Sequence, residues 1–444
     1  MEDRVKAAVA AVFFPEGDRP VAVALSGGRD SVALLHALIN RTPKINSLSA
    51  LHIDHGLRPE AEEEAAFVRA LCRTWNVPLS VVSVNVPANR RAGESMEAAA
   101  RRLRYQAFEE NAPQDALIAT AHHAGDQAET VVQHLLRGSG LRGLGGMAPQ
   151  RGRYIRPLLG VTREDIDAYC TRYALAYVED SSNADVAIQR NRIRHELMPV
   201  LKEYNPQIVP ALAAMADTLR EDEAYFEQQA QQALTENGFS VFGGEAAVVD
   251  RAAFNRPAPI QKRMIRQMLR AIGAYDLTQT AFLHALQAVN TGRSATLPGH
   301  IHVRGGAAVQ VYRPAMPVPE QEFSEPGQYR FGVFNISVGL GAPMPARGPW
   351  CAHVSPAVLT HGLSVRLRRP KDTVAMPYGS ALLSDLMMDR KVPFCLRDRV
   401  PVFTADGAVV WAPGVPPSAG INAVNGDGVC HITVEGIDLG GYEL

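Results

Sequence analysis

The chain has 444 residues, of which 46% are hydrophobic and 20% are charged, and its net charge is −1. This length is enough for two to four domains with buried cores. The balanced charge excludes a protein that is basic throughout, so any nucleic-acid surface has to be a local patch.

Five scattered cysteines give no sign of a cross-linked or metal-bound scaffold. They are Cys72, Cys170, Cys351, Cys395 and Cys430, and none belongs to a Cys-x-x-Cys pair. Such a set is not expected of a disulfide framework, an iron–sulfur site or a structural zinc site. The N-terminus lacks the layout of a signal peptide, and no run approaches the roughly 18 apolar residues of a membrane span. We therefore expect a soluble cytoplasmic protein without a membrane segment.

The first two hundred residues alternate apolar strand-like runs with helical patterns. We expect strands at 21–25, 47–55, 78–86 and 116–121, and helices at 1–14, 32–38, 59–75, 96–110, 122–137 and 162–173. Such alternation predicts βαβ units around a parallel sheet, whose ligand lies at the carboxyl ends of the strands. The Gly-rich run 137–146 is either an active-site loop or a plain linker.

The pattern changes at Asn205-Pro206. We expect helices at 205–234, 261–272 and 277–289, a hairpin with a Gly-Gly turn at 299–312, a proline-rich linker at 314–319, and a helix at 380–390 among short strands. These elements predict three domains: an α/β domain over 1–204, a mainly helical domain over 205–315 and a small α+β domain over 316–444.

The most informative stretch joins the first expected strand to its helix and reads Ser26-Gly27-Gly28-Arg29-Asp30-Ser31. Glycines let the backbone approach a ligand closely, and the N–H groups at the start of a helix bind anions, phosphate above all. Asp30 would repel phosphate, but it makes sense if it holds a Mg²⁺ ion that bridges to the phosphates. An ordinary strand-to-helix turn is the alternative, and a lone Ser-Gly-Gly would favour it.

A second cluster follows the fourth expected strand. His122, Asp126 and Glu129 have the spacing i, i+4 and i+7, which puts them on one face of a helix. One histidine and two carboxylates could hold Mg²⁺ or position a reacting base, because neighbouring carboxylates favour a cation between them. A solvated polar face is the alternative.

Three further clusters carry charges that suit a nucleotide or RNA. They are Asp54 and Arg58 after the second expected strand, Arg101 and Arg104 on the helix 96–110, and Arg190 and Arg194 at helical spacing. Arginine side chains form forked hydrogen bonds with phosphate and with the RNA backbone. The alternatives are a capping aspartate, intrahelical ion pairs with Glu97, and a solvated basic helix.

The run at 26–31 resembles the PP-loop of the N-type ATP pyrophosphatases, and the whole set of motifs is similar to the tRNA(Ile)-lysidine synthase family. The motifs, in chain order, are Ser26-Gly27-Gly28-x-Asp30-Ser31, His52-x-Asp54-His55-Gly56-Leu57-Arg58, Glu97-x-x-x-Arg101-x-x-Arg104-Tyr105, Ala121-His122-His123-x-x-Asp126-Gln127-x-Glu129-Thr130, Arg156-Pro157-Leu158, Asp180-x-x-Asn183 and Arg190-Asn191-x-x-Arg194. The resemblance is dense from about 21 to 201. In addition, 368–372 and 391–402 resemble the C-terminal domain of the family's long form.

This resemblance implies a PP-loop fold and a reaction in two steps. ATP adenylates the C2 oxygen of the wobble cytidine in the isoleucine tRNA with anticodon CAU, and pyrophosphate is released. The ε-amine of L-lysine then attacks C2 and releases AMP, which leaves lysidine and changes the codon from AUG to AUA. The implied cofactors are ATP and Mg²⁺, and the implied partners are this tRNA and L-lysine.

The resemblance also implies roles for the residues of the motifs. The expected catalytic residues are Asp30, His122, Asp126 and Glu129, with Asp30 and Asp126 as metal ligands. The expected nucleotide-binding residues are Ser26, Gly27, Gly28, Arg29, Asp30, Ser31, Asp54, Arg58, Arg101, Arg104, Arg190 and Arg194. The candidate tRNA contacts in the later domains are Arg368, Arg369, Lys371, Tyr378, Arg397 and Arg399, for which ordinary surface charge is the alternative.

Other functions remain as alternatives at this point. A PP-loop tRNA thiolase normally needs cysteines for sulfur transfer or a cluster, and none of the five here is suitably paired or close to the motifs. A small-molecule amide or amine synthetase shares the PP-loop, but it needs no basic C-terminal domain. A non-enzymatic RNA-binding module would leave the phosphate turn and the carboxylate face unexplained.

Overall fold

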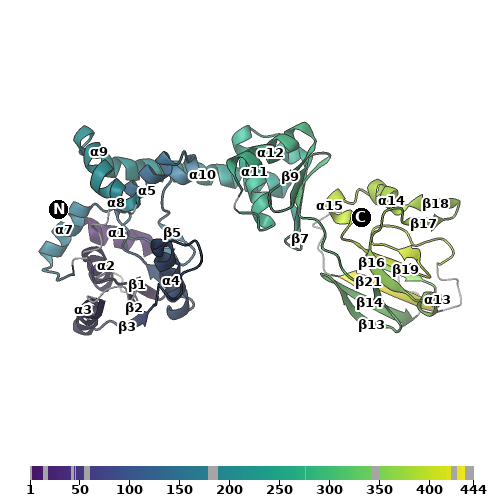
Figure 1. Ribbon diagram of the computed structural model, residues 1–444, viewed down its shortest axis with the longest axis horizontal. Helices are drawn as coiled ribbons and strands as arrows, with labels where there is room; N and C mark the ends of the chain where they lie inside the picture. The colour runs from purple at the N-terminus through teal and green to yellow at the C-terminus, as the bar shows by residue number, and fades with distance from the viewer. Residues whose placement is uncertain are drawn as a thin grey trace. The chain divides into compact units, whose positions relative to one another are not determined.

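The computed structural model of the chain describes residues 3–13, 19–41, 45, 47–54, 61–178, 189–275, 277–341, 350–421 and 428–435. The chain divides into two compact units, Met1–Ala224 and Tyr225–Leu444, and each is described here by itself. Figure 1 labels the helices and strands of both units.

The first unit is built on a six-stranded sheet with the order β3-β2-β1-β4-β6-β5. Its strands are β1 (Val21–Ala24), β2 (Leu48–Asp54), β3 (Leu79–Ser83), β4 (Leu117–Ala119), β5 (Gln150–Arg151) and β6 (Tyr154–Ile155). All neighbouring strands are parallel except β5, which runs antiparallel to β6. The predicted parallel sheet of βαβ units is therefore confirmed.

Helices make up most of the rest of this unit. They are α1 (Arg4–Phe13), α2 (Arg29–Ile39), α3 (Ala61–Thr74), α4 (Met96–Asn111), α5 (Ala124–Leu136), α6 (Leu141–Leu144), α7 (Arg163–Arg172), α8 (Gln189–Arg192) and α9 (Met198–Tyr204), with a π-helical turn η2 (Ile193–Leu197) before α9. Helix α10 (Ile208–Glu236) begins in the first unit and ends in the second. No described helix combines the length and the apolar composition that a membrane crossing requires.

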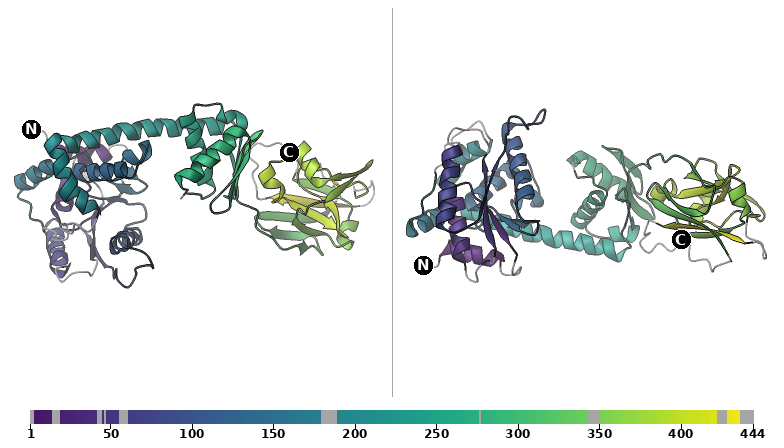
Figure 2. Two further views of the ribbon diagram at one scale, coloured as in Figure 1. Left: turned by 45° about the horizontal axis from the view of Figure 1, so that its top comes forward. Right: turned by 90° about the horizontal axis from the view of Figure 1, so that it is seen from below.

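Helices cover both faces of the parallel sheet (Figure 2). One buried cluster joins strand β1 to helices α1, α2, α3 and α7, and it includes Val23, Val9, Leu35, Val68 and Ile166. On the other face, helix α4 packs on β1 and β4 in a cluster that includes Phe108, Ala22 and Ile118. Burial on both faces explains why these strands are continuous apolar runs without alternation.

The strand order places a switch point beside β1. Strand β1 pairs with β2 on one side and with β4 on the other. After β1 the chain adds β2 and β3 on one side, and it then crosses back to add β4 on the other side. In open parallel sheets, ligands bind at the carboxyl ends of the strands at such a point. The segments that follow β1 and β4 carry the run at 26–31 and the histidine–carboxylate cluster, so the fold brings the two main motifs to one place.

The second unit begins with a five-stranded antiparallel sheet of order β7-β8-β11-β10-β9. Its strands are β7 (Ser240–Phe242), β8 (Ala246–Asp250), β9 (Ser294–Leu297), β10 (Ile301–Arg304) and β11 (Ala308–Tyr312), and its helices are a 3₁₀ turn η3 (Arg251–Phe254), α11 (Ala258–Ala271) and α12 (Gln279–Thr291). Met268 of α11 and Phe282 of α12 share a buried cluster with Val303 and Val311 of the sheet. The predicted hairpin at 299–312 is confirmed as β10 and β11, while β7, β8 and β9 add strands to a segment predicted as mainly helical.

The remainder of the second unit is a small α+β arrangement, as predicted. Its sheets have the orders β12-β16-β19-β20, β13-β14-β21-β15 and β17-β18. The strands are β12 (Gln321–Glu322), β13 (Gly327–Phe331), β14 (Phe334–Gly341), β15 (Cys351–Val354), β16 (Ser364–Leu367), β17 (Thr373–Met376), β18 (Gly379–Leu382), β19 (Pro401–Ala405), β20 (Ala408–Trp411) and β21 (Val429–Glu435). The helices are α13 (Ala357–Thr360), α14 (Leu383–Asp389) and α15 (Phe394–Arg397).

Several expected helix starts differ from the observed ones by two or three residues, and at two of them the structure shows the reason. Helix α5 begins at Ala124 and not at residue 122, because His123 is its N-cap and has an extended backbone with φ −122°. The expected helix at 380–390 begins as strand β18, because residues 379–382 pair with β17 before α14 starts at Leu383. In both places a local tertiary or capping contact overrides the helical pattern.

Two adjacent glycines at the hairpin turn give a test of the fold. A Cβ at Gly305 would lie 2.7 Å from the Ala288 carbonyl oxygen and 2.9 Å from that of Val289, both of them backbone atoms of α12. We expect Gly305→Ala to lower the free energy of unfolding by about 1–3 kcal/mol, because the strand and the helix have to separate. At Gly306 the nearest atom to a Cβ would be 3.7 Å away, so Gly306→Ala should change the free energy of unfolding by less than about 0.5 kcal/mol. Denaturant unfolding of both variants is the measurement, and equal stabilities would contradict this account.

Candidate active site

The turn after β1 has the geometry of an anion cradle. Gly27 has φ +89°, and a Cβ there would lie 3.2 Å from Cγ2 of Val68, so glycine is required for both its conformation and its size. The Gly28 N–H donates to Oγ of Ser26 at 3.3 Å, and Oγ of Ser31 donates to the Gly28 carbonyl at 2.8 Å. Gly28 is also the N-cap of α2 and has no side chain to cap the helix. The first N–H groups of α2 therefore point toward a place that suits an anion.

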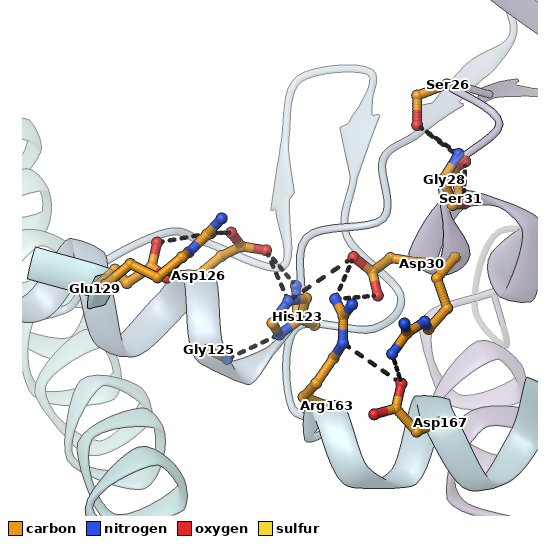
Figure 3. Close-up of polar contacts among 12 residues, drawn as sticks. Ser26, Gly28, Asp30, Ser31, His123, Gly125, Asp126, Glu129, Arg163 and Asp167 are labelled. Carbon is orange, nitrogen blue, oxygen red and sulfur yellow. Dashed lines mark hydrogen bonds and ion pairs between the residues drawn. The ribbon is translucent and has the colours of Figure 1, made fainter. Parts of the chain in front are cut away.

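Asp30 lies in the first turn of α2, between a cation and a histidine (Figure 3). Nη1 of Arg163, the first residue of α7, donates to both carboxylate oxygens of Asp30 at 3.1 Å. Nε2 of His123 lies 4.0 Å from Oδ2 of Asp30. Burial raises the pKa of Asp30 above its ordinary value, although His123 and Arg163 both oppose this shift.

The side chain of Arg29 makes its contacts with α7 and the segment after it. Its guanidinium pairs with Asp167, and its Cζ lies 4.7 Å from the centre of the Tyr177 ring. Asp167 is also 3.5 Å from Nε of Arg163, so one carboxylate serves both arginines. Arg29 therefore fixes α2 to α7, and its backbone N–H belongs to the first turn of α2.

His123 is the residue that joins the two predicted motifs, and the sequence reasoning did not select it. Its backbone N–H donates to Oδ2 of Asp126 at 3.0 Å, and its Nδ1 accepts from the Gly125 N–H at 3.0 Å. Because Nδ1 accepts, the neutral ring carries its proton on Nε2, which lies 3.6 Å from Asp126 and 4.0 Å from Asp30. His123 thus holds one N–H toward two carboxylates.

The predicted carboxylates and arginines of the first unit meet one another. Arg190 donates to Oδ1 of Asp126 at 2.6 Å and to Oε2 of Glu129 at 2.9 Å. Arg194 donates to the same Asp126 oxygen at 3.2 Å and to both oxygens of Glu129. The i, i+4 spacing of the arginines therefore matches the i, i+3 spacing of the carboxylates. Burial favours protonation of Asp126, but His123, Arg190 and His122 outweigh it and hold the pKa of Asp126 below its ordinary value.

His122 precedes α5 and lies against the sheet. Its Nδ1 is 3.0 Å from Oγ1 of Thr120, a buried residue that follows β4. Burial lowers the pKa of His122 to about 4, and the nearby Arg156, Arg190 and Arg101 add to this effect. The imidazole is therefore neutral at physiological pH and serves as a hydrogen-bonding group without charge.

Arg101 and Arg104 of α4 add positive charge near the same site. Nη2 of Arg101 is 3.5 Å from the Tyr105 hydroxyl, and Cζ of Arg101 lies 5.1 Å from the centre of that ring. Burial lowers the pKa of Arg104, and the like charges of Arg101 and Arg190 lower it further. Three arginines from α4 and α8 are thus close enough to repel one another, which is an arrangement that an anion would relieve.

The remaining predicted residues of this unit are less informative. Asp54 ends β2 at the carboxyl edge of the sheet, and its carbonyl accepts from the Val84 N–H at 2.7 Å. Arg58 and the motif Asp180-x-x-Asn183 lie outside the described residues. Among the side chains that are described, no three or more His, Cys, Asp or Glu gather into a group that could hold a metal by themselves.

Five of the six candidate tRNA contacts in the second unit fall into two groups, and the sixth, Arg397 of α15, donates to the Val392 carbonyl at 2.9 Å. Arg368 pairs with Asp398, Arg369 with Glu320, and Arg399 with Glu245, where Arg399 also donates to the Arg313 carbonyl. Arg399 is mostly buried, so the structure places it inside the unit. In contrast, Tyr378 is fully exposed at the tip between β17 and β18, and Lys371 lies in an exposed turn with φ +70°.

Comparison with known proteins identifies the class that this fold and turn define. Residues 1–201 match the PP-loop domain family, and residues 363–434 match the TilS substrate C-terminal domain family. The chain is therefore a PP-loop enzyme that uses ATP.

Full-length relatives make the assignment narrower. A tRNA(Ile)-lysidine synthase from Symbiobacterium thermophilum is 35% identical over 445 residues, which cover 90% of this chain and 90% of that protein. One from Pseudomonas aeruginosa is 45% identical over 207 residues, which cover 45% of this chain and 46% of that protein. The chain belongs to the tRNA(Ile)-lysidine synthase family, which confirms the resemblance seen in its motifs.

A solved structure shares part of this fold at a lower level of similarity. The U34-tRNA thiolase NcsA from Methanococcus maripaludis, with its 4Fe–4S cluster, has a TM-score of 0.41 and 15% sequence identity. The match covers 49% of this chain and 78% of that one.

The paired arginines and carboxylates predict strong energetic coupling. In a double-mutant cycle of Arg194→Gln and Glu129→Gln, we expect a coupling free energy of about 1–3 kcal/mol, because Glu129 is buried and Arg194 donates to both of its carboxylate oxygens. Arg192 and Glu196, an exposed pair at 3.4 Å in the same segment, supply the matched cycle. That cycle should give less than about 0.5 kcal/mol. Denaturant unfolding measures both, and similar values for the two cycles would refute the coupling.

His122 predicts a pH dependence of stability. The pKa of His122 in the folded state, about 4, lies below the model-peptide value of 6.5. Between these two pH values His122 is protonated in the unfolded chain and neutral in the folded chain. The contribution of His122 to stability is therefore complete above pH 6.5 and falls as the pH drops from 6.5 toward 4. We expect the free energy of unfolding of His122→Gln, measured by denaturant unfolding at several pH values, to change less between pH 6.5 and pH 4 than that of the unmodified chain. His284→Gln, at an exposed position of α12, should leave the profile unchanged.

Proposed function

We propose that this protein joins L-lysine to C2 of the wobble cytidine in the isoleucine tRNA with anticodon CAU. In the first step the C2 oxygen of cytidine attacks the α-phosphorus of ATP, and pyrophosphate leaves. In the second step the ε-amine of lysine attacks C2 and loses a proton, and the C2 oxygen leaves with AMP. The product is lysidine, and membership of the tRNA(Ile)-lysidine synthase family supports this assignment.

One observation carries the proposal for the site. Nε2 of His123 lies 4.0 Å from Asp30 and 3.6 Å from Asp126, so the cradle after β1 and the helix after β4 form one connected polar site. The site is at the switch point of the sheet, where nucleotides bind in folds of this kind. An adenylating enzyme needs these two parts side by side, because the nucleophile attacks the α-phosphorus of ATP from the side opposite to the leaving pyrophosphate.

In the first step the cradle would bind the leaving pyrophosphate. The N–H groups of Gly28 and of the first turn of α2, together with the hydroxyls of Ser26 and Ser31, would donate to its oxygens. Mg²⁺ supplies charge neutralisation when it is bound, and Asp30 and Asp126 would hold it. Two carboxylates fit this ion, because Mg²⁺ in phosphate sites takes one or two carboxylates and fills its shell with phosphate oxygens and water.

In the second step Asp126 and Glu129 would steer the lysine ammonium toward the cytidine. The lowered pKa of Asp126 keeps it ionised, which suits this role. Arg190 and Arg194 balance the two carboxylates and present further N–H donors for phosphate. His122 stays neutral and would hydrogen-bond the nucleotide or the base, while Arg101 and Arg104 would hold phosphate or RNA.

The two cysteines of the first unit argue against sulfur transfer as the second step. Cys72 and Cys170 are buried in the core, and burial raises the pKa of each thiol to about 11. A thiol of that kind is a poor nucleophile at neutral pH. We therefore do not propose a PP-loop thiolase or a small-molecule synthetase as a second function, and the experiment below distinguishes both from lysine transfer.

The three sequence-defined segments receive separate roles in this proposal. Residues 1–204 would bind ATP and carry out the chemistry, while 205–315 and 316–444 would bind the tRNA. This division assigns the reaction to residues 1–204 and the recognition of RNA to residues 205–444.

The proposal predicts incorporation of lysine into RNA. We expect label from L-lysine to appear in a transcript of the CAU isoleucine tRNA only when ATP and Mg²⁺ are present. Asp30→Ala should reduce this incorporation by at least about a hundredfold, because the cradle loses its metal-binding carboxylate. The measurement is labelled lysine in acid-precipitated RNA.

Asp115→Asn is the matched control, since Asp115 is an exposed aspartate of the same unit whose backbone carbonyl contacts Arg19. It should retain full incorporation. If no label appears with lysine but pyrophosphate is released with a sulfur donor or another amine, the substrate assignment is wrong. If no pyrophosphate is released with any nucleophile, adenylation itself is refuted.

A further inference from the structure

One face of the five-stranded sheet in the second unit is only partly covered. Phe242 of β7 and Val248 of β8 pack in a cluster with Leu396 and Val402 from the C-terminal part of the chain. Tyr312 of β11 is at the margin of this cluster, and His302 of β10 is its cross-strand partner. On strands β10 and β11, part of this face therefore lies outside the area that the C-terminal segment covers.

Three rings line up along this partly exposed face. His302 and Tyr312 are stacked, with centroids 5.3 Å apart and an interplanar angle of 23°. Tyr312 meets Phe394 of α15 at 6.3 Å in an edge-on arrangement, and the side chain of Phe394 is 38% exposed. The Cys395 N–H donates to Oε1 of Gln310 at 3.0 Å in a buried contact, which fixes α15 on the sheet. The rings therefore form an aromatic row that runs from β10 and β11 to α15.

Positive charge gathers on the exposed ring of this row. Cζ of Arg304 lies 4.1 Å from the centre of the Phe394 ring, and Cζ of Arg397 lies 5.9 Å from it. Burial lowers the pKa of Arg397, and Arg304 and Arg368 lower it further. Asp398 pairs with Arg368 and also attracts Arg397, but among the described residues neither Arg304 nor Arg397 forms an ion pair with a carboxylate.

Two guanidiniums held on one ring repel each other, and a bound anion would relieve this repulsion. Arginine forks match phosphate oxygens, and the partly exposed Phe394 ring, together with the Arg304 guanidinium that lies over it, offers a flat surface for stacking a base. An acidic peptide would satisfy the charge, but it would leave this flat surface without a matching partner. The combination of arginines and a stacked aromatic row therefore favours RNA.

We propose that His302, Arg304, Tyr312, Phe394 and Arg397, here called the Arg304–Phe394 platform, bind the RNA of the tRNA substrate. Arg304 and Arg397 contact backbone phosphates, and Phe394 stacks on a base. This assignment rests on the proposed function and adds residues to it: Arg304, His302, Tyr312 and Phe394 were not among the candidate contacts, and Arg397 was.

The test is the salt dependence of tRNA binding, measured with the full chain and without ATP or lysine. A labelled transcript of the CAU isoleucine tRNA is titrated by filter binding at several salt concentrations. Arg304→Gln and Arg397→Gln should each reduce the slope of log K against log salt by about 0.7 to 0.9, because each removes one phosphate contact. Phe394→Ala should weaken binding about tenfold and leave that slope unchanged, since stacking releases no counterions. All three should raise the KM for tRNA and keep the rate at saturating tRNA.

Two substitutions outside the platform serve as matched controls. Arg330→Gln removes an exposed arginine of β13, and Tyr275→Ala removes a ring that is 73% exposed. Both should bind like the unmodified chain. Slopes and affinities of the platform variants equal to those of the controls would overturn the inference, as would displacement of the tRNA by poly-glutamate as effectively as by an unrelated RNA. A chain that binds tRNA through the platform but forms no lysidine would contradict only the proposed function.

Discussion

A buried carboxylate has to have a cation beside it, and this requirement organises the whole active site. In the first unit carboxylates alternate with N–H donors along one connected series, which is Arg163, Asp30, His123, Asp126, Arg190 with Arg194, and Glu129. Helices α2, α5, α7 and the α8–η2 segment each contribute to this series. The positions of four helix ends are thereby tied to one set of ion pairs, in addition to the apolar clusters behind them.

The parallel sheet makes this concentration of charge tolerable. Strands β1 and β4 end side by side, so the N-termini of α2 and α5 both face the crevice with their partial positive charge. Asp30 and Asp126 are each in the first turn of one of these helices, where a negative charge is stabilised. The helix N-termini thus stabilise part of the negative charge of the two carboxylates, in addition to the side-chain cations. It explains why acidic residues stand in a site that also has to accept phosphate.

The sequence predicted the parts of the structure that depend on local pattern. The parallel sheet, the cradle at 26–31 and the pairing face of Asp126 and Glu129 follow from apolar runs, glycines and helical spacing. The contacts of Arg163 and Asp167 did not follow, because they join residues more than 130 positions apart and no local pattern reports them.

His123 and the extra strands of the middle segment show a different reason for failure. His123 and Asp126 form a reciprocal capping box, in which a histidine takes the place of the usual serine or threonine. That spacing is present in the sequence, but a helix that begins at residue 122 hides it, because His123 then lies inside the helix and not at its N-cap. Strands β7, β8 and β9 have three to five residues each, and in a helix-rich segment such short runs give no periodicity to detect.

The π-helical turn between α8 and α9 has a consequence for how this segment tolerates change. In η2 the Met198 N–H reaches back five residues to the Ile193 carbonyl, so the turn holds one residue more than an α-helix would. Arg190 and Arg194 point at the carboxylates of α5, while Met198 packs on Ala128 and Val132 of the same helix. One residue rotates a helix by about 100°, so loss of the extra residue would turn either the arginines or the apolar side chains away from α5. The length of this segment is therefore as much a constraint on the enzyme as the identity of its arginines.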